Sequence, residues 1–329
     1  MKILVTGSSG HLGEGLVRVL RKNDALDVLG LDVKPSPYTT HVGSIQDTAL
    51  VNQCMAGVDT LYHTATLHKP HIETHSKAEF LATNIGGTLS LLEAAVTHSV
   101  RSVVFTSTTS TFGDALRPPP GQAAAWVTEQ TDPIPKNIYG TTKIAAEDLC
   151  QLFHRQEGLN CIILRTSRFF AEEDDNDGIR NGFADANAKL NEFLYRRVDL
   201  QDVVDAHIRA AARAPELRFG CYIVSATTPL NADDAMALNE DATPVVAKHV
   251  SGFEDAYRAL GWRMFVRIDR VYVNDAARKD LGWEPRFDFG AMLRRCLNGE
   301  KPMSALAAEV GSHGYHDQVF TGRPYPARQ

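Results

Sequence analysis

Short apolar runs and helical repeats alternate along the first half of the sequence. Residues 2–6 read KILVT and residues 28–32 read VLGLD, and compact aliphatic runs of this kind are typical of buried strands. Further strands are predicted at 60–63, 102–107 and 160–165. Apolar residues spaced three and four apart predict helices at 12–20, 48–55, 84–95 and 137–149. This alternation indicates a parallel sheet with helices on both faces, which binds ligands at the carboxyl ends of its strands.

The loop after the first predicted strand reads GSSGHLG, with glycines at 7, 10 and 13. Between a strand and a helix, such glycines permit a tight turn and the close approach of a pyrophosphate to the backbone. Asp32 ends the next strand, 19 residues after Gly13. A carboxylate there binds a ribose diol and repels a 2′-phosphate, so NAD is the favoured cofactor. Lys34 lies nearby and keeps NADP as the second choice.

These features predict an α/β fold, a Rossmann-type doubly wound parallel sheet with a smaller C-terminal substrate domain. We expect residues 1–170 to form the NAD-binding domain, with the chain returning to it around residues 198–228. Residues 171–329 should form mainly the substrate-binding domain. A chain of 329 residues suits one large domain or two modest ones.

Tyr139 and Lys143 stand four residues apart in a predicted helix, so their side chains share one face. A free phenol has a pKa of about 10, too high for a base at neutral pH. A neighbouring ammonium, together with a positive nicotinamide ring, favours the phenolate. A hydroxyl must then hold the substrate oxygen. The hydroxyl-rich strand end offers Thr108, with Ser107 as the alternative.

With these motifs in place, the chain resembles the extended short-chain dehydrogenase/reductase family, in its NAD-dependent epimerase/dehydratase group. The resemblance rests on the glycine loop, HTAT (63–66), TNIGGT (83–88), FTSTTSTFG (105–113), YGTTK (139–143), VDLQDVV (198–204) and LGWEP (281–285). It implies that Tyr139 is the base and that Lys143 also binds the nicotinamide ribose. The predicted catalytic residues are Tyr139, Lys143 and Thr108.

The resemblance also implies which residues contact the ligands. Cofactor contacts are expected from Gly7, Gly10, His11, Leu12, Gly13, Asp32, Ser44, Ile45, Thr64, Ala65, Thr66, Asn84, Thr106, Tyr139 and Lys143. Substrate contacts are expected from Thr108, Thr109, His68 and Arg168. A metal ion is not expected to take part.

Several departures from the family pattern bear on the substrate. Dehydratases of the group carry an Asp-Glu pair after the active threonine, whereas Thr109 and Ser110 stand here, so dehydration is disfavoured. Arg168 replaces an asparagine that seats a nucleotide sugar. Two interpretations are open: its guanidinium binds an anionic substrate group, or it pairs with the acidic run at 172–177. The segment from 165 to 202 is also short for a nucleotide-sugar enzyme.

These features leave three functions open. The first is an NAD-dependent oxidoreductase or epimerase acting at a secondary alcohol of a sugar or sugar nucleotide. The alternative is a dehydrogenase or reductase of a small free sugar, sugar acid or other polar alcohol. A non-catalytic NAD-binding regulator is disfavoured by the intact catalytic residues.

Four histidines at 63, 68, 71 and 75 and the acidic run at 172–177 are weaker signals. The histidine spacing matches no standard closed zinc site, which leaves substrate contact, most plausible for His68 or His71, or a polar loop. The acidic run lacks the alternation of a calcium loop and is predicted to be a solvated, mobile loop or a lid. The tail from residue 309 is expected to wrap over the substrate domain or a partner subunit.

Bulk composition narrows the partners. The net charge is −6 and basic residues form no block, which argues against nucleic acid or an anionic membrane surface as a partner. No apolar run is long enough to span a bilayer. Five cysteines without a CxxC pair indicate reduced thiols and a cytoplasmic protein. The family resemblance implies a homodimer built through the helices around Asn84 and Tyr139.

Overall fold

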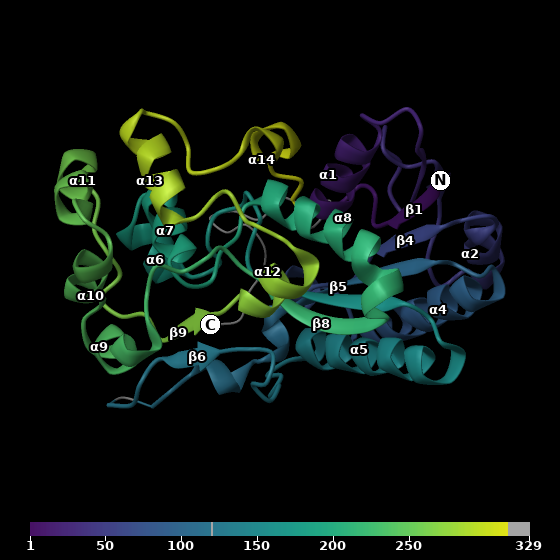
Figure 1. Cartoon of the computed structure of the whole chain (residues 1–329), viewed down its shortest axis with the longest axis horizontal. Helices are drawn as coiled ribbons and strands as arrows, with labels where there is room; N and C mark the ends of the chain where they lie inside the picture. Colours follow the sequence, from purple (N-terminus) through teal and green to yellow (C-terminus); the bar gives the residue numbers. More distant parts are fainter. Residues whose placement is uncertain (120, 315–329) are drawn as a thin grey trace.

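A sheet of seven parallel strands forms the centre of the protein (Figure 1), as seen in a computed structural model that describes residues 1–119 and 121–314. Its order is β3-β2-β1-β4-β5-β7-β8, with every pairing parallel. The strands are β1 (Lys2–Thr6), β2 (Asp27–Asp32), β3 (His41–Val42), β4 (Thr60–His63), β5 (Ser102–Thr108), β7 (Cys161–Thr166) and β8 (Phe219–Val224). The predicted fold class is confirmed.

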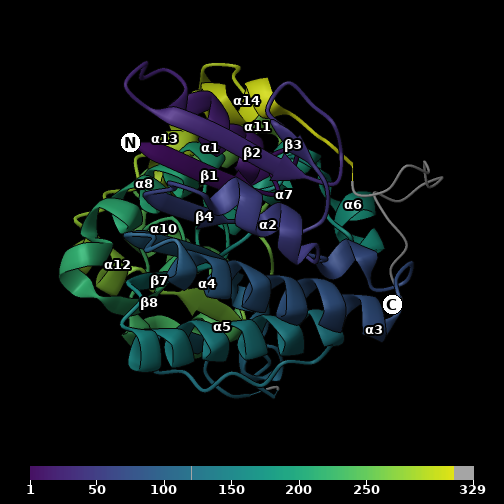
Figure 2. The ribbon, with the colours of Figure 1, turned by 90° about the vertical axis from the view of Figure 1, so that its right-hand side faces the viewer.

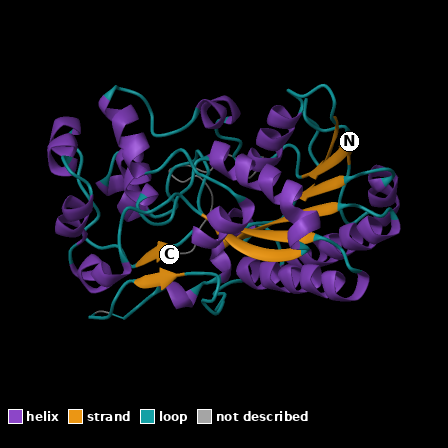
Figure 3. Cartoon of the chain, in the orientation of Figure 1, coloured by secondary structure: helices purple, strands orange, loops and turns teal. Residues whose placement is uncertain are grey.

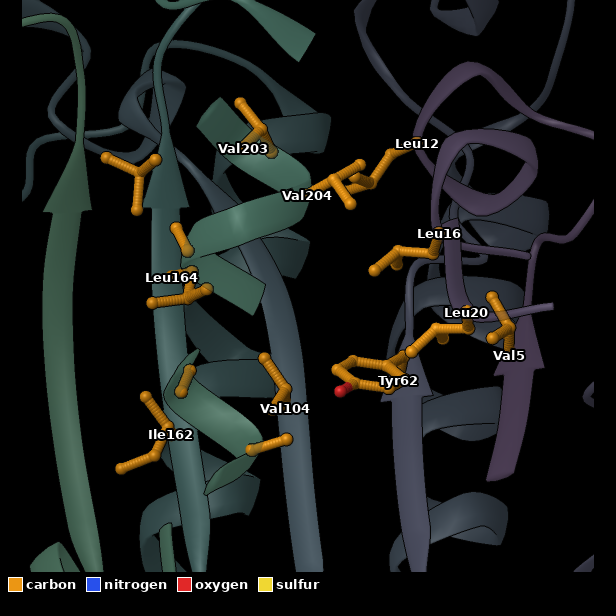
Figure 4. Packing of buried hydrophobic residues seen from close by; sticks show 14 of the residues in the cluster. Val5, Leu12, Leu16, Leu20, Tyr62, Val104, Ile162, Leu164, Val203 and Val204 are labelled. Atoms are coloured by element: carbon orange, nitrogen blue, oxygen red, sulfur yellow. The ribbon is translucent and has the colours of Figure 1, made fainter. Parts of the chain in front are cut away.

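Helices cover both faces of the sheet because successive strand residues point to opposite sides. One face packs against α1 (His11–Leu20), α8 (Leu200–Leu217), α12 (Asp275–Leu281) and α14 (Ala305–Val310). Figure 4 shows this layer, where Leu16 and Val204 lie over strand residues such as Val104. The other face packs against α2 (Thr48–Met55), α4 (Gly87–Thr97) and α5 (Ile138–Glu157). Figure 2 shows α4 and α5 side by side on that face.

Local sequence signals set the ends of α5, the helix that carries Tyr139 and Lys143. Asn137 caps its first turn, where the side-chain oxygen accepts a hydrogen bond from the amide of Gly140 at 3.0 Å. Gly158 ends the helix in the left-handed conformation, with φ of 69°. The helix is longer than the 137–149 expected from periodicity because no glycine or proline lies between Gly140, in its first turn, and Gly158.

The helix predicted at 84–95 has a different form in the structure. The helical run begins with α3 (Lys77–Phe80), continues as a π-helical turn over Leu81–Gly86, and becomes α4. Its start is fixed by a capping box in which Glu79 accepts from the amide of Ser76 at 2.7 Å and Ser76 accepts from the amide of Glu79 at 3.2 Å. The sequence signal for this start was present and was not used in the prediction.

The chain leaves the sheet after β7 and returns to it through α8 and β8. The excursion forms α6 (Asp177–Gly182) and α7 (Asp185–Phe193). After β8 the chain builds a second core with α9 (Ala235–Glu240), α10 (Ala242–His249), α11 (Phe253–Leu260) and α13 (Phe289–Leu297). A separate parallel pair, β6 (Ala125–Val127) with β9 (Arg270–Tyr272), lies beside these helices (Figure 3).

Trp283 and Asp202 join this second part of the chain to the sheet layer. The indole of Trp283 donates to the carbonyl of Asp202 at 3.0 Å, and the Asp202 carboxylate accepts from the amides of Arg286 and Phe287 at 3.0 and 2.9 Å. Both residues belong to motifs that the sequence analysis singled out, and their role here is structural. Of the helices that the structure describes, none has both the length and the apolar character to cross a membrane. The tail beyond residue 314 lies outside the described residues, so the expectation for it is untested there.

Candidate active site

A cleft of about 1970 Å³ opens at the carboxyl ends of the sheet strands, where parallel sheets bind ligands. It runs from the glycine loop and Asp32, past the ends of β4 and β5, to residues of the C-terminal part of the chain. Most of the predicted site residues line it: Gly7, Gly10, His11, Leu12, Gly13, Asp32, Ser44, Ile45, Thr64, Ala65, Thr66, His68, Thr106, Thr108, Thr109, Tyr139 and Arg168. Two predicted residues, Lys143 and Asn84, are buried and are not among the lining residues.

The glycine loop has no room for side chains at two of its positions. Gly7 has φ of 72°, and a Cβ there would lie 2.7 Å from the amide nitrogen of Ala65. A Cβ on Gly13 would lie 1.9 Å from the carbonyl oxygen of Gly7. The loop thus brings its backbone close to the start of α1, and Gly10, which precedes the helix, has no side chain to cap the first amides.

Asp32 stands beside this loop at the end of β2. Its two carboxylate oxygens accept hydrogen bonds from the amides of Ser9, at 3.0 Å, and Lys34, at 2.8 Å. These bonds fix the carboxylate at the edge of the cleft. A backbone cradle that excludes side chains, next to a fixed carboxylate, fits the pyrophosphate and adenosine ribose of a dinucleotide.

Tyr139, Thr108 and Lys143 meet between α5 and the end of β5. The Thr108 side chain hydrogen-bonds the phenol of Tyr139. Lys143 donates to the carbonyl of Thr106 at 2.7 Å, and its ammonium lies 3.9 Å from the centre of the Phe105 ring. The three residues that carry the predicted chemistry are therefore within one turn of helix and one strand end.

Burial dominates the proton affinities at this point. It raises the pKa of Tyr139 to about 12, against the Thr108 hydrogen bond, which lowers it. It lowers the pKa of Lys143 to about 7, against the attraction of Glu147, which raises it. Because burial holds the phenol in its neutral form, a phenolate at neutral pH requires positive charge beside the ring, such as that of an oxidised nicotinamide ring.

Glu147 lies one turn beyond Lys143 and anchors α5 to the sheet. Its carboxylate accepts from the hydroxyl of Ser107 and from Arg165, whose Nη2 lies 2.7 Å from Oε2. Both side chains of this ion pair are at least nine-tenths buried. The bond of the Ser107 hydroxyl to Glu147 favours Thr108 over Ser107 as the hydroxyl that would hold the substrate oxygen, and this role of Thr108 stays a prediction.

Asn84 has a tethering role in the structure. Its amide nitrogen donates to Thr142 of α5 at 3.0 Å and to the carbonyl of Leu67 at 2.8 Å. Its oxygen accepts from the amide of Leu67 and the hydroxyl of Thr66. Asn84 thus holds the loop after β4 against the catalytic helix, and a direct cofactor contact from it stays a prediction.

Comparison with known proteins identifies the family. The sequence profile of the NAD dependent epimerase/dehydratase family matches residues 3–217, which is more than half of the chain. The chain belongs to this family. The glycine loop, Asp32, Tyr139 and Lys143 all fall within the matched residues, and the resemblance predicted from the sequence is confirmed.

Individual relatives are distant. An uncharacterized UDP-glucose epimerase of Bacillus subtilis (strain 168) is 30% identical over 185 residues, a match that spans 50% of this chain and 55% of that protein. A low-salt glycan biosynthesis protein of Haloferax volcanii is 26% identical over 91% of this chain and 98% of its own length. A solved short-chain dehydrogenase/reductase superfamily protein from Agrobacterium tumefaciens with bound NAD is similar in fold: the TM-score is 0.64 and the identity 23%, over 91% of this chain and 96% of that one.

Arg168, where the sequence departs from the family pattern expected from the resemblance, lies in the cleft but is paired within the chain. Its Nη1 donates to Asp174 at 2.7 Å and lies 3.7 Å from Glu192 and from Asp175. The pairing with the acidic run, one of the two interpretations that the sequence left open, is therefore present. Asp175 in turn pairs with Lys69 from the loop after β4. Burial raises the pKa of Asp175, but Lys69 and Arg168 outweigh it and lower that pKa to about 2.

The prediction that residues 172–177 form a solvated loop is wrong for two of the acids. Glu172 and Asp174 are each only 8% exposed. Buried carboxylates require cationic or hydrogen-bonding partners. Asp174 has Arg168 nearby in the chain, but Arg196 and the His11 partner of Glu172 come from distant segments that local sequence does not reveal. Among the described residues, no group of histidines, cysteines and acids could hold a metal ion.

His63 lies apart from the other three histidines, whose rings contact one another between β4 and α3: His68 with His71 at 4.8 Å, and His71 with His75 at 5.1 Å. His63 is buried between the hydroxyls of Thr6 and Thr88, both at 2.9 Å, so its role is structural. His68 faces the cleft, with its ring 6.3 Å from that of Tyr139 and 4.8 Å from that of His71. Burial and the neighbouring His71 hold the pKa of His68 well below its usual range. A substrate contact from His68 stays a prediction that its position favours.

Phe170 is a cleft residue that the sequence analysis did not select. Its ring lies 5.4 Å from that of His11 and 5.6 Å from that of His68, so it joins the glycine loop to the loop after β4. Arg196 was also missed; it pairs with Glu192 at 2.6 Å on the substrate side. The four-residue spacing of Glu192 and Arg196 was the available signal.

Proposed function

We propose that this chain oxidises a secondary alcohol of a sugar or sugar-nucleotide substrate, with Tyr139 as the base and NAD as the cofactor. The observation that carries the proposal is the hydrogen bond between Thr108 and Tyr139 in a cleft that also contains the glycine loop and Asp32. The B. subtilis relative named as a UDP-glucose epimerase and the A. tumefaciens structure with bound NAD support the substrate class and the cofactor.

In this proposal, the three catalytic residues have different tasks. The Thr108 hydroxyl holds the substrate oxygen, and the Tyr139 oxygen takes the proton from the substrate hydroxyl. Lys143 fixes the position of α5 through Thr106 and adds positive charge behind the site. A bound NAD, which the glycine loop and Asp32 would hold, would supply the hydride acceptor and the positive charge that favours the phenolate. Dehydration remains disfavoured because Thr109 and Ser110 follow Thr108.

A second candidate is a net dehydrogenase of a free sugar, sugar acid or other polar alcohol, which releases NADH. The short excursion between β7 and α8 favours it, because that excursion contains only α6 and α7 among the described elements to cover a nucleotide. An epimerase returns the hydride to the substrate and keeps its cofactor, so the two candidates differ in net NADH formation.

The test combines substrate screening with variants. Purified protein is incubated with NAD and with sugars, uronates or nucleotide sugars, and NADH absorbance and product stereochemistry are measured. Net NADH with a free sugar or acid contradicts the epimerase, while isomerised product without net NADH contradicts the dehydrogenase.

Tyr139→Phe should lower turnover by about 10²–10⁴-fold while NAD still binds, because it removes the proton acceptor alone. Tyr38→Phe, which alters a phenol outside the cleft, is the matched control. Activity of Tyr139→Phe near that of the control would show that another group is the base.

We also propose a cytoplasmic homodimer. All five cysteines are free thiols, which suits a reducing compartment. The outer face of the α4–α5 layer is available for a second copy, and Leu81 at its end is 49% exposed. Sedimentation of the purified protein measures the assembly.

A further inference from the structure

The carboxylate of Glu172 joins three segments that are far apart in the sequence. Glu172 follows β7, yet its Oε1 lies beside the glycine loop and beside the segment after α14. Four groups donate to this oxygen: His11 Nε2 at 2.8 Å, Ser312 Oγ at 2.8 Å, and the amides of His313 at 3.2 Å and Gly314 at 3.3 Å. We call residues 311–314 the C-terminal strap.

The near end of the strap is fixed in the core. α14 packs on α1 through the buried residues Leu306 and Val310, and Gly311 turns the chain with φ of 67°. Beyond that turn, His313 and Gly314 line the cleft together with the glycine loop. The strap therefore runs from a rigid helix to the mouth of the proposed cofactor site.

The side chain of His313 extends along the glycine loop. Its ring lies 4.6 Å from the ring of His11, and its Nε2 lies 3.3 Å from the carboxylate of Glu14 in α1. It also hydrogen-bonds the backbone of Ser9. The strap thus contacts both the loop that would hold the pyrophosphate and the helix that follows it.

We propose that the C-terminal strap, latched by Glu172, is part of the cofactor site and slows the release of a bound nicotinamide dinucleotide. The proposal rests on the NAD-binding function proposed above. It adds a binding element from outside residues 3–217, the part of the chain that matches the family.

The chemistry of the latch makes it strong. His11 and Ser312 overcome burial and hold the pKa of Glu172 at about 2, so the carboxylate is ionised at neutral pH. Hydrogen bonds to an ionised acceptor are roughly twice as strong as neutral ones. Opening the strap separates this buried carboxylate from its three donors on the strap. The strap also contacts the glycine loop, where the pyrophosphate would bind, so its release would uncover that end of the cleft.

Retention has different consequences for the two candidate reactions. An epimerase uses the same NAD in each turnover, so a closed strap would not slow its turnover. A dehydrogenase exchanges cofactor in each cycle, so opening of the strap would limit its turnover. The strap thus links the reaction type to a measurable rate.

The test measures NADH dissociation from the full-length protein. Protein loaded with NADH is mixed with excess NAD in a stopped-flow instrument, and the loss of bound-NADH fluorescence gives the rate. The variants are Glu172→Gln, which weakens the latch, and Ser312→Ala, which removes one donor from an exposed position. Glu173→Gln, which changes the neighbouring exposed acid of the same cleft, is the matched control. Hydrogen exchange of residues 312–314, with and without NADH, reports on the strap itself.

We expect dissociation to be about tenfold faster in Glu172→Gln, equivalent to about 1.4 kcal/mol of barrier. Ser312→Ala should be about threefold faster, and Glu173→Gln should stay within about twofold of the native protein. Exchange in the strap should slow on NADH binding. Native rates in both latch variants, or slower release from either, would overturn the proposal. Failure of the native protein to bind NADH would instead refute the proposed function, and the strap proposal with it.

Discussion

Replacing Glu147 by leucine tests how the catalytic helix is held to the sheet. The ion pair of Glu147 with Arg165 is buried, with side-chain exposures of 7% and 10%, and Ser107 donates to the same carboxylate. Removal of one partner of a buried pair leaves an uncompensated charge and typically costs about 3–5 kcal/mol. With about 2.1 cal/mol/K of unfolding entropy per residue, a chain of 329 residues should lose about 4–7 °C in Tm.

The assay is thermal and urea denaturation of the native protein, the single variant and the double variant Glu147→Leu/Arg165→Met. The double variant should recover most of the loss, because it replaces the buried pair by apolar side chains. Asp255→Asn is the control: it breaks a pair with Arg258 that is more than 70% exposed, and should cost less than about 0.5 kcal/mol. A cost of less than about 1 kcal/mol for Glu147→Leu, or a double variant no more stable than the single one, would refute the reasoning.

Two further expectations concern the cofactor loop and acid stability. Gly13→Ala should abolish measurable NADH binding, since its Cβ would lie 1.9 Å from the carbonyl oxygen of Gly7. Gly86→Ala is the control, because the nearest atom to its Cβ lies 3.9 Å away. Equal NADH affinity in the two variants would contradict this reasoning. Burial lowers the pKa of His207 to about 4, so the unfolded chain binds the extra proton below pH 6.5 and about 3 kcal/mol of stability is lost as pH falls towards 4. Two other buried histidines shift the same way. Burial raises the pKa of Asp202 to about 6, so between about pH 6 and 4 the folded state binds a proton there and gains stability, which opposes the loss from the histidines. We therefore expect Tm, measured from pH 6.5 to 4.5, to fall. A level Tm over that range would show that the histidines do not dominate.

The features that local sequence encodes were predicted well. Strands such as β1 and β5 are compact apolar runs, and the glycine loop and Tyr139–Lys143 pair depend on residues within seven positions of one another. Topology then follows, because right-handed crossovers bring the strand ends to one edge of the sheet. For this reason the predicted residues of the glycine loop, of the loop after β4 and of the β5 strand end lie in one cleft.

Features that depend on distant partners were not predicted. Asp174 is buried beside Arg168, a pairing that the sequence had left open, and beside Arg196, which lies beyond α6 and α7 and was not anticipated. β6 and β9 pair across 145 positions, from Ala125 to Arg270, and neither strand shows a clear periodicity. The contact of Glu172 with the strap joins positions 140 apart. In each case the energy comes from desolvation and pairing, which a linear pattern does not contain.

Because the chain leaves the sheet after β7 and re-enters it at β8, no single cleavage divides the molecule into two folding units. A fragment that ends at residue 170 would lack the edge strand β8 and the helix α8, and the faces of Ile162 and Leu164 that now pack beneath α8 would meet water. The excursion between β7 and α8, which contains α6 and α7, must therefore fold together with the sheet. Recombination between relatives would have to exchange two separate stretches of chain at once to transplant a new specificity.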